Sequence, residues 1–272
     1  CRLVFRSIEQ REQKTQVLRD WIPAGASRLL DRVVTLTGRS RIVGVDDWES
    51  AVARTPGYGA LDSSGPPTRP EMPLWMSART QQVMAAFGSA LDRCQGRDVI
   101  RVLDVGGARG DYAGLIALSY PKRRFKWTVL ETPETARRQK PFESDDLVWV
   151  DSMDAVDPHV DIVLASAVIQ FLEDPHQRLT ELLARSDWLV LNRVPLWPIP
   201  DDAPAVHRAR VGGPVLYPCW MFAEHRFLAT LRMTGEVVLR WHVPQDVAFF
   251  AGVRRPYQGL LVRARPTDDH AR

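Results

Sequence analysis

The stretch VLDVGGARGDY, residues 102–112, decides the fold of this chain. Apolar residues and the acid Asp104 lead into Gly106 and Gly107, and a third glycine follows at Gly110. Because glycine has no Cβ, the backbone can turn sharply there and a ligand can approach it closely. In an open parallel sheet, ligands bind beyond the carboxyl ends of the strands. The stretch therefore predicts a buried strand that ends in a ligand-binding turn.

From about residue 99 onward, apolar patterns of strand and helix alternate. The predicted strands are VIRVLDV, FKWTVLE, LVWVD, the first part of VDIVLASAVIQFL, DWLVLNRV, EVVLRWHV and YQGLLVRAR. The predicted helices are DYAGLIALSY, PHQRLTELLARS and FAEHRFLATLRMTG. This alternation favours an α/β fold, a Rossmann-like, doubly wound sheet of seven mostly parallel strands with an N-terminal helical extension. The segment VPQDVAFFAGVRRP, between the last two strands, is too long for a tight hairpin.

The part of the chain before this alternation has a different pattern. The expected elements are a helix over 7–36 broken at 22–25, a short helix within 45–59 capped by Asp46 or Asp47, a loop over 62–73, and a helix over about 74–94. We therefore divide the chain into a helical N-terminal extension or lid with its linker, residues 1–95, and a cofactor-binding domain, residues 96–272.

Composition narrows the classes of protein. With 272 residues, 45% of them hydrophobic, the chain can bury one sizeable core or a core and a smaller lobe. The net charge of +3 is small and gives no reason to expect a nucleic-acid partner. No run of 18 apolar residues predicts a membrane span. The three cysteines have no metal-ligand spacing, and no signal-peptide pattern is visible, so we expect no metal and a reducing cytoplasm.

A second acid belongs with the glycine turn. The strand FKWTVLE ends at Glu131, where a carboxylate can accept both ribose hydroxyls of an adenosine. A turn of this kind fits both NAD and S-adenosylmethionine. Asp104 favours S-adenosylmethionine, because a carboxylate would repel a pyrophosphate but can bind the amino group of a methionine.

At these residues the sequence resembles the class I S-adenosylmethionine-dependent methyltransferases. VLDVGGARG is similar to their first motif, WTVLE to their second, DIVLASAVIQFLEDP to their fourth-strand segment and LVLNRVPL to their fifth. Ala108 stands where the first motif usually has another glycine. A closer resemblance, over about residues 40–245, is to a poorly characterised bacterial methyltransferase family associated with surface-polysaccharide genes. The features shared with it include WESA…PGY, DVGGARGDY, NRVPL and LYPCWMF.

The resemblance also implies places for other cofactor-binding residues. Asp151 and Ser152, after the third strand, would meet the adenine amino group. Ser166 and Gln170 would lie where the fourth strand opens, close to the methionine end of the cofactor.

Candidates for the chemistry of an acceptor are few. His207 is the base candidate, because an imidazole titrates near neutral pH, and a surface loop histidine is the alternative. Arg193 would hold an anionic acceptor or a cofactor carboxylate, or else pair with Asp201 or Asp202. Tyr217, expected beside a helix start, would line the acceptor pocket or anchor that helix.

Two further expectations concern the surroundings of this site. We expect a lid made of two pieces, one around WESAVARTPGYG and the other the stretch 194–220, over the acceptor. His176, at a helix start, is expected on the surface, and Cys219 is expected to be a packed thiol.

The leading hypothesis is a methyltransferase that uses S-adenosylmethionine on a small molecule or a sugar or glycan precursor, by O- or N-methylation. An NAD-dependent nucleotide-sugar oxidoreductase or epimerase is the first alternative, although no Tyr-x-x-x-Lys pair is present. A non-catalytic partner subunit on a methyltransferase fold is the second, and a homodimer stays open.

Overall fold

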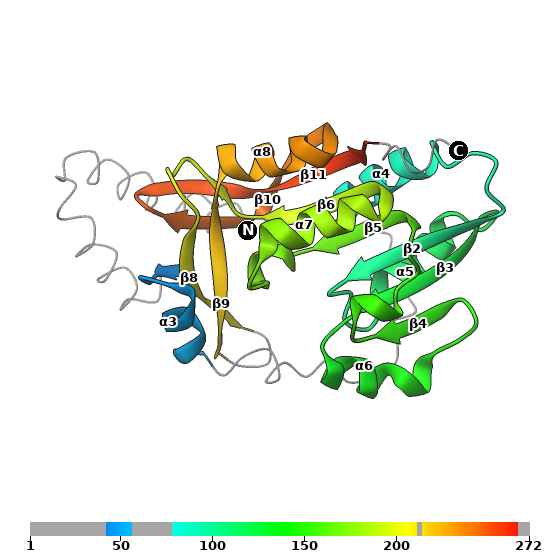
Figure 1. Ribbon diagram of the computed structural model, residues 1–272, viewed down its shortest axis with the longest axis horizontal. Coiled ribbons are helices and arrows are strands. Elements are labelled where there is room, and N and C mark those ends of the chain that lie inside the picture. Colours follow the sequence, from blue (N-terminus) through cyan, green and yellow to red (C-terminus); the bar gives the residue numbers. More distant parts are fainter. Residues whose placement is uncertain (1–41, 56–77, 211–213, 266–272) are drawn as a thin grey trace, which may run out of the picture.

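The computed structural model describes residues 42–55, 78–210 and 214–265 (Figure 1). Its larger sheet has seven strands in the order β10-β11-β6-β5-β2-β3-β4. These strands are β2 (Val99–Val105), β3 (Arg124–Leu130), β4 (Leu147–Val150), β5 (Val160–Ser166), β6 (Ser186–Val194), β10 (Gly235–Phe250) and β11 (Val253–Ala264). Strands β2 to β6 are parallel, and β11 runs antiparallel to both β6 and β10. The predicted α/β fold with seven mostly parallel strands is confirmed.

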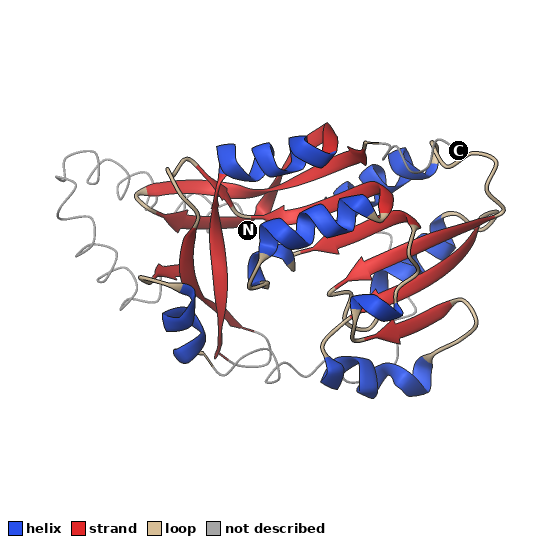
Figure 2. Cartoon of the chain, in the orientation of Figure 1, coloured by secondary structure: helices blue, strands red, loops and turns tan. Residues whose placement is uncertain are grey.

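Helices cover both faces of this sheet (Figure 2). They are α4 (Ala78–Leu91), α5 (Asp111–Ser119), α6 (Pro133–Gln139), α7 (Pro175–Ala184) and α8 (Glu224–Thr234), with the short 3-10 helices η2 (Lys140–Phe142), η3 (Met153–Ala155) and η4 (Ile169–Phe171). One core lies between the sheet and α4 and α5, and a second lies between the sheet and α7 and α8. Successive residues of β5 point into the two cores in turn, as Ile162 and Val163 do. This explains why the central strands read as unbroken apolar runs.

A smaller sheet, which we call the cap, stands beyond the seven-stranded sheet. Its strands are β1 (Ile42–Gly44), β8 (Ala203–Arg210), β9 (Pro214–Ala223) and β7 (Leu196–Trp197), in that order. The short helix α3 (Trp48–Ala53), capped by Asp47, packs on it through stacked rings of Trp48 and Trp220 whose centroids lie 5.1 Å apart. In Figure 1, β8 and β9 stand on the side toward which β2 points. The cap thus faces the carboxyl ends of the parallel strands.

The cap corrects one expectation. The stretch 194–220 was predicted as a loop leading to a helix start, and it instead forms β7, β8 and most of β9. Prolines and glycines in this stretch suggested a loop. However, β8 pairs with β9 over its whole length, with His207 opposite Tyr217, so the pairing of two cap strands overrides the local turn preference.

The link between the last two strands corrects another. β10 and β11 form one long hairpin whose register runs from Gly235–Ala264 to Phe250–Val253. The two-residue loop consists of Ala251 and Gly252, which both have positive φ, as a type I′ turn requires. Pro244 is tolerated because β10 is an edge strand and because the register shifts there. The residues between Tyr257 and the hairpin turn do not pair with β6, and this end of the hairpin packs against the cap.

Some predicted elements can be compared only in part. The helix expected over about 74–94 is present as α4, and the short helix within 45–59 is present as α3. The helix expected over 7–36 and the loop over 62–73 lie outside the described residues. The division at residue 95 stays a prediction.

The hairpin turn gives a paired test of backbone strain. A Cβ at Gly252 would meet nothing within 4 Å, so Gly252→Ala adds only the cost of the left-handed backbone, roughly 1–2 kcal/mol. Ala251 already bears that strain at φ 48°. We expect Gly252→Ala to lower the free energy of unfolding by about 1 kcal/mol and Ala251→Gly to raise it by a smaller amount. Urea denaturation checks both, and a destabilising Ala251→Gly would contradict this geometry.

Candidate functional site

The turn after β2 has an unusual backbone. Gly106 and Gly110 have φ values of 67° and 72°, and Ala108 between them has 48°. The Gly106 N–H donates to the carbonyl of Leu130 at 2.8 Å, which ties the turn to the end of β3. A Cβ at Gly110 would press on the Trp149 ring at 3.2 Å. The glycines at 106 and 110 are therefore required by the conformation and by the packing of the turn.

Asp104 is the buried acid of this turn. It is 1% exposed, and its Oδ2 has no hydrogen-bond partner in the described part of the chain. Burial raises the pKa of the Asp104 carboxyl to about 8, with the nearby Trp127 indole acting against this shift and the charges of Glu131 and Asp111 adding to it. A Cβ at Gly107 would collide with this carboxyl group. The Asp104 carboxyl can therefore lie against residue 107 only because that residue is glycine.

Glu131 joins the same turn from β3. Its Oε1 accepts the N–H of Ala108 at 2.9 Å, and its Oε2 accepts the N–H of Thr132 at 2.9 Å. Each carboxylate oxygen can accept a second hydrogen bond, so Glu131 can still receive hydroxyl groups. Its position is fixed beforehand by two backbone N–H groups, which is what a binding residue needs.

The ends of the next strands carry the other predicted cofactor residues. Asp151 and Ser152 are exposed after β4, and the Ser152 hydroxyl accepts the N–H of Asp154 at 3.1 Å. Ser166 ends β5, pairs in register with Asn192 of β6, and lies 3.3 Å from its Nδ2. Gln170 lies in η4 and is 3% exposed.

Asn192 was missed by the sequence analysis. It is fully buried, and its Oδ1, like the Oε1 of Gln170, has no hydrogen-bond partner among the described residues. The only signal was a polar residue at the end of the apolar run LVLN. Two acceptor oxygens without partners thus lie near the ends of β5 and β6, and they would favour a ligand that brings N–H or O–H groups.

Backbone strain is concentrated at the same edge of the sheet. Four non-glycine residues of the described part have positive φ, and three of them, Ala108, Ala167 and Arg193, lie at the carboxyl ends of β2, β5 and β6. Residues held in such conformations cluster at ligand sites. This observation, independent of any motif, indicates that the site lies at this edge.

Three aromatic rings join the cap to the sheet there. Tyr217 and His207 are cross-strand neighbours, with ring centroids 5.2 Å apart. Phe171 of η4 meets Tyr217 edge-on at 5.1 Å and lies parallel to His207 at 6.3 Å. We call Phe171, His207 and Tyr217 the aromatic cluster. It brings two of the three predicted catalytic residues together.

Arg193 is the third. It pairs with Asp246 of β10, its Nε lying 2.8 Å from Oδ2, so the expectation of a pair with Asp201 or Asp202 is wrong. The long hairpin reaches the cap and so places Asp246 beside Arg193, although the two are 53 residues apart in the sequence.

Burial raises the pKa of the Tyr217 phenol, and the Arg193 charge opposes that shift. Tyr217 is thus a neutral phenol at neutral pH, suited to hydrogen bonding rather than to proton abstraction.

Two other side chains complete the comparison. His176 is half-buried rather than on the surface, because its Nε2 lies 2.6 Å from Asp202 and its Nδ1 lies 2.7 Å from the Thr230 hydroxyl. Cys219 is buried, and burial raises the pKa of its thiol, so it is the packed thiol that was expected.

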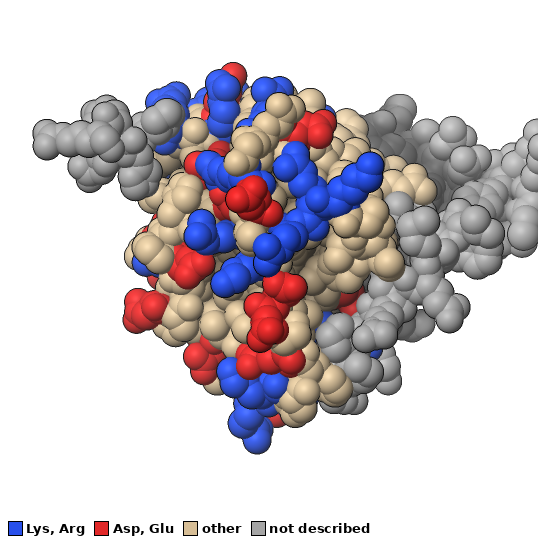
Figure 3. All heavy atoms as spheres, turned by 90° about the vertical axis from the view of Figure 1, so that its right-hand side faces the viewer, with Lys and Arg blue, Asp and Glu red and all other residues tan. Residues whose placement is uncertain are grey.

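Charges, metals and membranes add little at this site. Lys and Arg side chains form a band on the face at the amino ends of the parallel strands, with Asp and Glu beside them (Figure 3). Arg97 and Arg101 there pair with Asp161 and Asp157.

Within residues 42–55, 78–210 and 214–265, no three His, Cys, Asp or Glu side chains are grouped to hold a metal. In the same ranges no helix has the length and apolarity to cross a membrane.

Comparisons with known proteins give structures but no family. No protein-family model and no curated protein matches the chain. The N-terminal domain of EvdMO1 with SAH bound is 17% identical over 71% of this chain and 83% of its own, with a TM-score of 0.45. The 1,6-didemethyltoxoflavin-N1-methyltransferase of Burkholderia thailandensis is 18% identical over 70% of this chain and 79% of its own, with a TM-score of 0.47. A putative sarcosine dimethylglycine methyltransferase of Galdieria sulphuraria is 9% identical over 68% of this chain and 84% of its own, with a TM-score of 0.46. Because these identities and TM-scores are low, any conclusion about function must be argued from this chain's own residues.

Asp104 gives a prediction about pH and stability. Its pKa in the fold, about 8, lies above the ordinary value of 3.8, so the fold favours the neutral carboxyl. That contribution is fully present below about pH 4 and is lost as the pH rises through about 8. We expect the free energy of unfolding of the ligand-free protein to fall, relative to Asp104→Asn, between pH 5 and pH 9. Urea denaturation at each pH measures it, and parallel curves for the two proteins would contradict the raised pKa.

Proposed function

We propose that this chain is an S-adenosylmethionine-dependent methyltransferase that acts on a small molecule or a sugar precursor, by O- or N-methylation. The observation that carries the proposal is the buried oxygen of Asp104, which has no hydrogen-bond partner among the described residues and lies against the backbone of Gly107. A ligand with a positively charged amino group would satisfy that oxygen and let the carboxyl ionise.

The other residues of the site fit the rest of this cofactor. Glu131 would accept the ribose hydroxyls, and Asp151 and Ser152 would lie toward the adenine. Ser166 and Gln170 would lie toward the methionine end. These placements follow the spatial order of the strand ends β5, β2, β3 and β4, along which an extended nucleoside can lie.

An NAD-dependent reaction is less compatible with the same residues. A pyrophosphate over the turn would lie beside the neutral Asp104 carboxyl, which brings no positive charge to hold it, and within reach of Glu131, whose negative charge would repel it. No hydride-site acid of the Tyr-x-x-x-Lys kind is present in the sequence.

The chemistry asked of the protein is positioning and the handling of one proton. The cofactor supplies a methyl group on a sulfonium, and an acceptor must be aligned in line with it. His207 would take the proton of an acceptor hydroxyl, Tyr217 would hold that hydroxyl by a hydrogen bond, and Arg193, fixed by Asp246, would orient an anionic group of the acceptor. The cap would keep water away from them.

Binding of the cofactor tests the proposal directly. At about pH 6.5 the Asp104 carboxyl of the free protein is neutral, and an ammonium placed beside it would ionise it. Calorimetry in buffers with different ionisation enthalpies should therefore show S-adenosylmethionine or its demethylated product binding with release of a proton, and no binding of NAD. In Asp104→Asn the proton release should vanish and affinity should fall at least about tenfold. Tight binding of NAD with none of the methyl donor would overturn the assignment.

Turnover tests the residues of the acceptor side. We expect His207→Ala, Arg193→Ala and Tyr217→Phe each to lower methyl transfer at least about tenfold while the dissociation constant of S-adenosylmethionine stays within about twofold. Metabolite extracts incubated with protein and labelled cofactor show the transfer as a product heavier by one methyl group. Full transfer by all three variants would remove them from the mechanism. Cofactor binding without any transfer would favour a non-catalytic subunit.

A further inference from the structure

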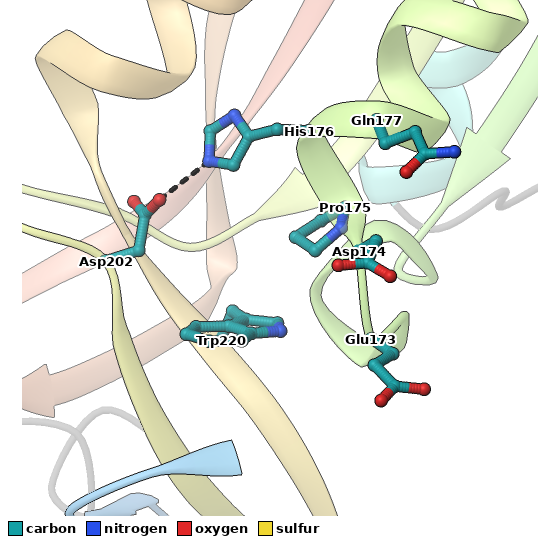
Figure 4. Close-up of a pocket in the computed structure, with 7 residues that line it drawn as sticks. All are labelled: Glu173, Asp174, Pro175, His176, Gln177, Asp202 and Trp220. Carbon is teal, nitrogen blue, oxygen red and sulfur yellow. Dashed lines mark hydrogen bonds and ion pairs between the residues drawn. The ribbon is translucent and has the colours of Figure 1, made fainter.

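One hollow of the described structure uses none of the residues proposed to bind the cofactor or the acceptor. It has a volume of about 210 Å³ and lies between the segment 173–177, which enters α7, and the cap (Figure 4). This is several times the ~30 Å³ that one water takes in the liquid and less than the roughly 300 Å³ of drug-sized ligand sites. We call it the α7 pocket. Its size suits one small organic group.

The walls of the α7 pocket differ in character. Figure 4 shows the Trp220 indole on one side, the His176–Asp202 pair across from it, and Pro175, Asp174 and Glu173 along a third side. The Trp220 ring is held in place by stacking on Trp48. The pocket thus has a rigid aromatic wall with carboxylates around it.

The side-chain donors that line the α7 pocket are already engaged within the protein. The Trp220 N–H donates to the carbonyl of Leu172 at 3.1 Å, and the Gln177 amide donates to Glu181 at 2.9 Å. Both ring nitrogens of His176 are occupied, one by Thr230 and one by Asp202. Apart from the second N–H of the Gln177 amide, which points away from Asp202 and Trp220 in Figure 4, no lining side chain is left to donate a hydrogen bond to a ligand.

The acceptors, by contrast, are available. Glu173 and Asp174 are exposed, and in the described part of the chain neither carboxylate has an ion pair or a hydrogen bond; Asp174 does not cap α7 with its side chain. Burial raises the pKa of Asp202, but hydrogen bonds from His176 and from the Ala223 N–H outweigh burial. The pKa is therefore lowered overall, and this group is a carboxylate. The nearby Arg226 is engaged with Asp201. Three carboxylates therefore face the pocket, against one imidazole.

This arrangement selects the ligand by chemistry. A neutral hydroxyl ligand both donates and accepts hydrogen bonds, whereas an ammonium only donates. An ammonium is also attracted to the face of a tryptophan ring. A bound metal ion is disfavoured, because these carboxylates are not grouped as a metal site within the described residues.

We propose that the α7 pocket binds the protonated amino group of a small organic amine, between the Trp220 ring and the carboxylates of Glu173 and Asp174. The inference does not depend on methyl transfer, since none of these residues belongs to the proposed cofactor or acceptor site. Glu173 of the pocket follows Phe171 of the aromatic cluster by two residues along the chain.

Nuclear magnetic resonance of the intact chain can test this inference. The indole N–H signal of Trp220 is assigned by its loss in Trp220→Phe and then followed at about pH 6.5 during titration with cyclohexylamine. Cyclohexanol, with the same ring and no charge, and glucose, a neutral polyol, are the comparison probes. We expect a saturable shift of the Trp220 signal with cyclohexylamine alone.

Substitutions then separate specific binding from general attraction of a cation. The double variant Glu173→Gln, Asp174→Asn should weaken cyclohexylamine binding at least about tenfold, and both side chains are exposed, so it should fold normally. Asp98→Asn removes an exposed charge before β2 and should leave the affinity within about twofold. Equal shifts with cyclohexanol or glucose, no shift with the amine, or unchanged affinity of the double variant would each overturn the inference. Cofactor binding measured in the same variants shows whether the proposed function stands regardless.

Discussion

The buried carboxyl group of Asp104 is the constraint on which the carboxyl end of the sheet depends. An acceptor oxygen that is buried without a partner costs roughly 1–3 kcal/mol. The fold maintains this cost, because β2 is held between β3 and β5 and the Asp104 carboxyl packs closely against Gly107. Glu131 adds to the constraint by holding the turn through the Ala108 N–H. Local stability is given up at a place where a ligand could restore it.

The cap shows a different principle, in which parts distant in the sequence are assembled around the end of one long hairpin. Its core gathers Ile42, Trp197 and Met221 against Val243 and Tyr257 of the hairpin. The hairpin also delivers Asp246 to Arg193. The acceptor side therefore owes its geometry to β10 and β11, which carry none of the candidate catalytic residues themselves.

The sequence predicted the seven-stranded sheet well, because strands buried on both faces leave long apolar runs that glycine turns and helices interrupt. It also predicted that Asp104 and Glu131 would lie at adjacent strand ends, since parallel strands meet at one edge. It failed where structure depends on partners far along the chain. β8 and β9 have prolines and no clean alternation, and only their mutual pairing makes them strands. Asn192, the Arg193–Asp246 pair and the burial of His176 likewise depend on tertiary contacts that no local pattern encodes.

The position of β1 has a consequence for the order in which the molecule is built. β1 is the first strand of the described chain, and its partner β8 follows nearly the whole parallel sheet, with Ile42 opposite His207. Closing so long a loop costs entropy before any contact repays it. During synthesis Ile42 can pair only after β8 has left the ribosome, and the core of the cap can form only after Val243 and Tyr257 have followed. The cap can therefore close only after the parallel strands have been made, although it contains the first strand of the described residues.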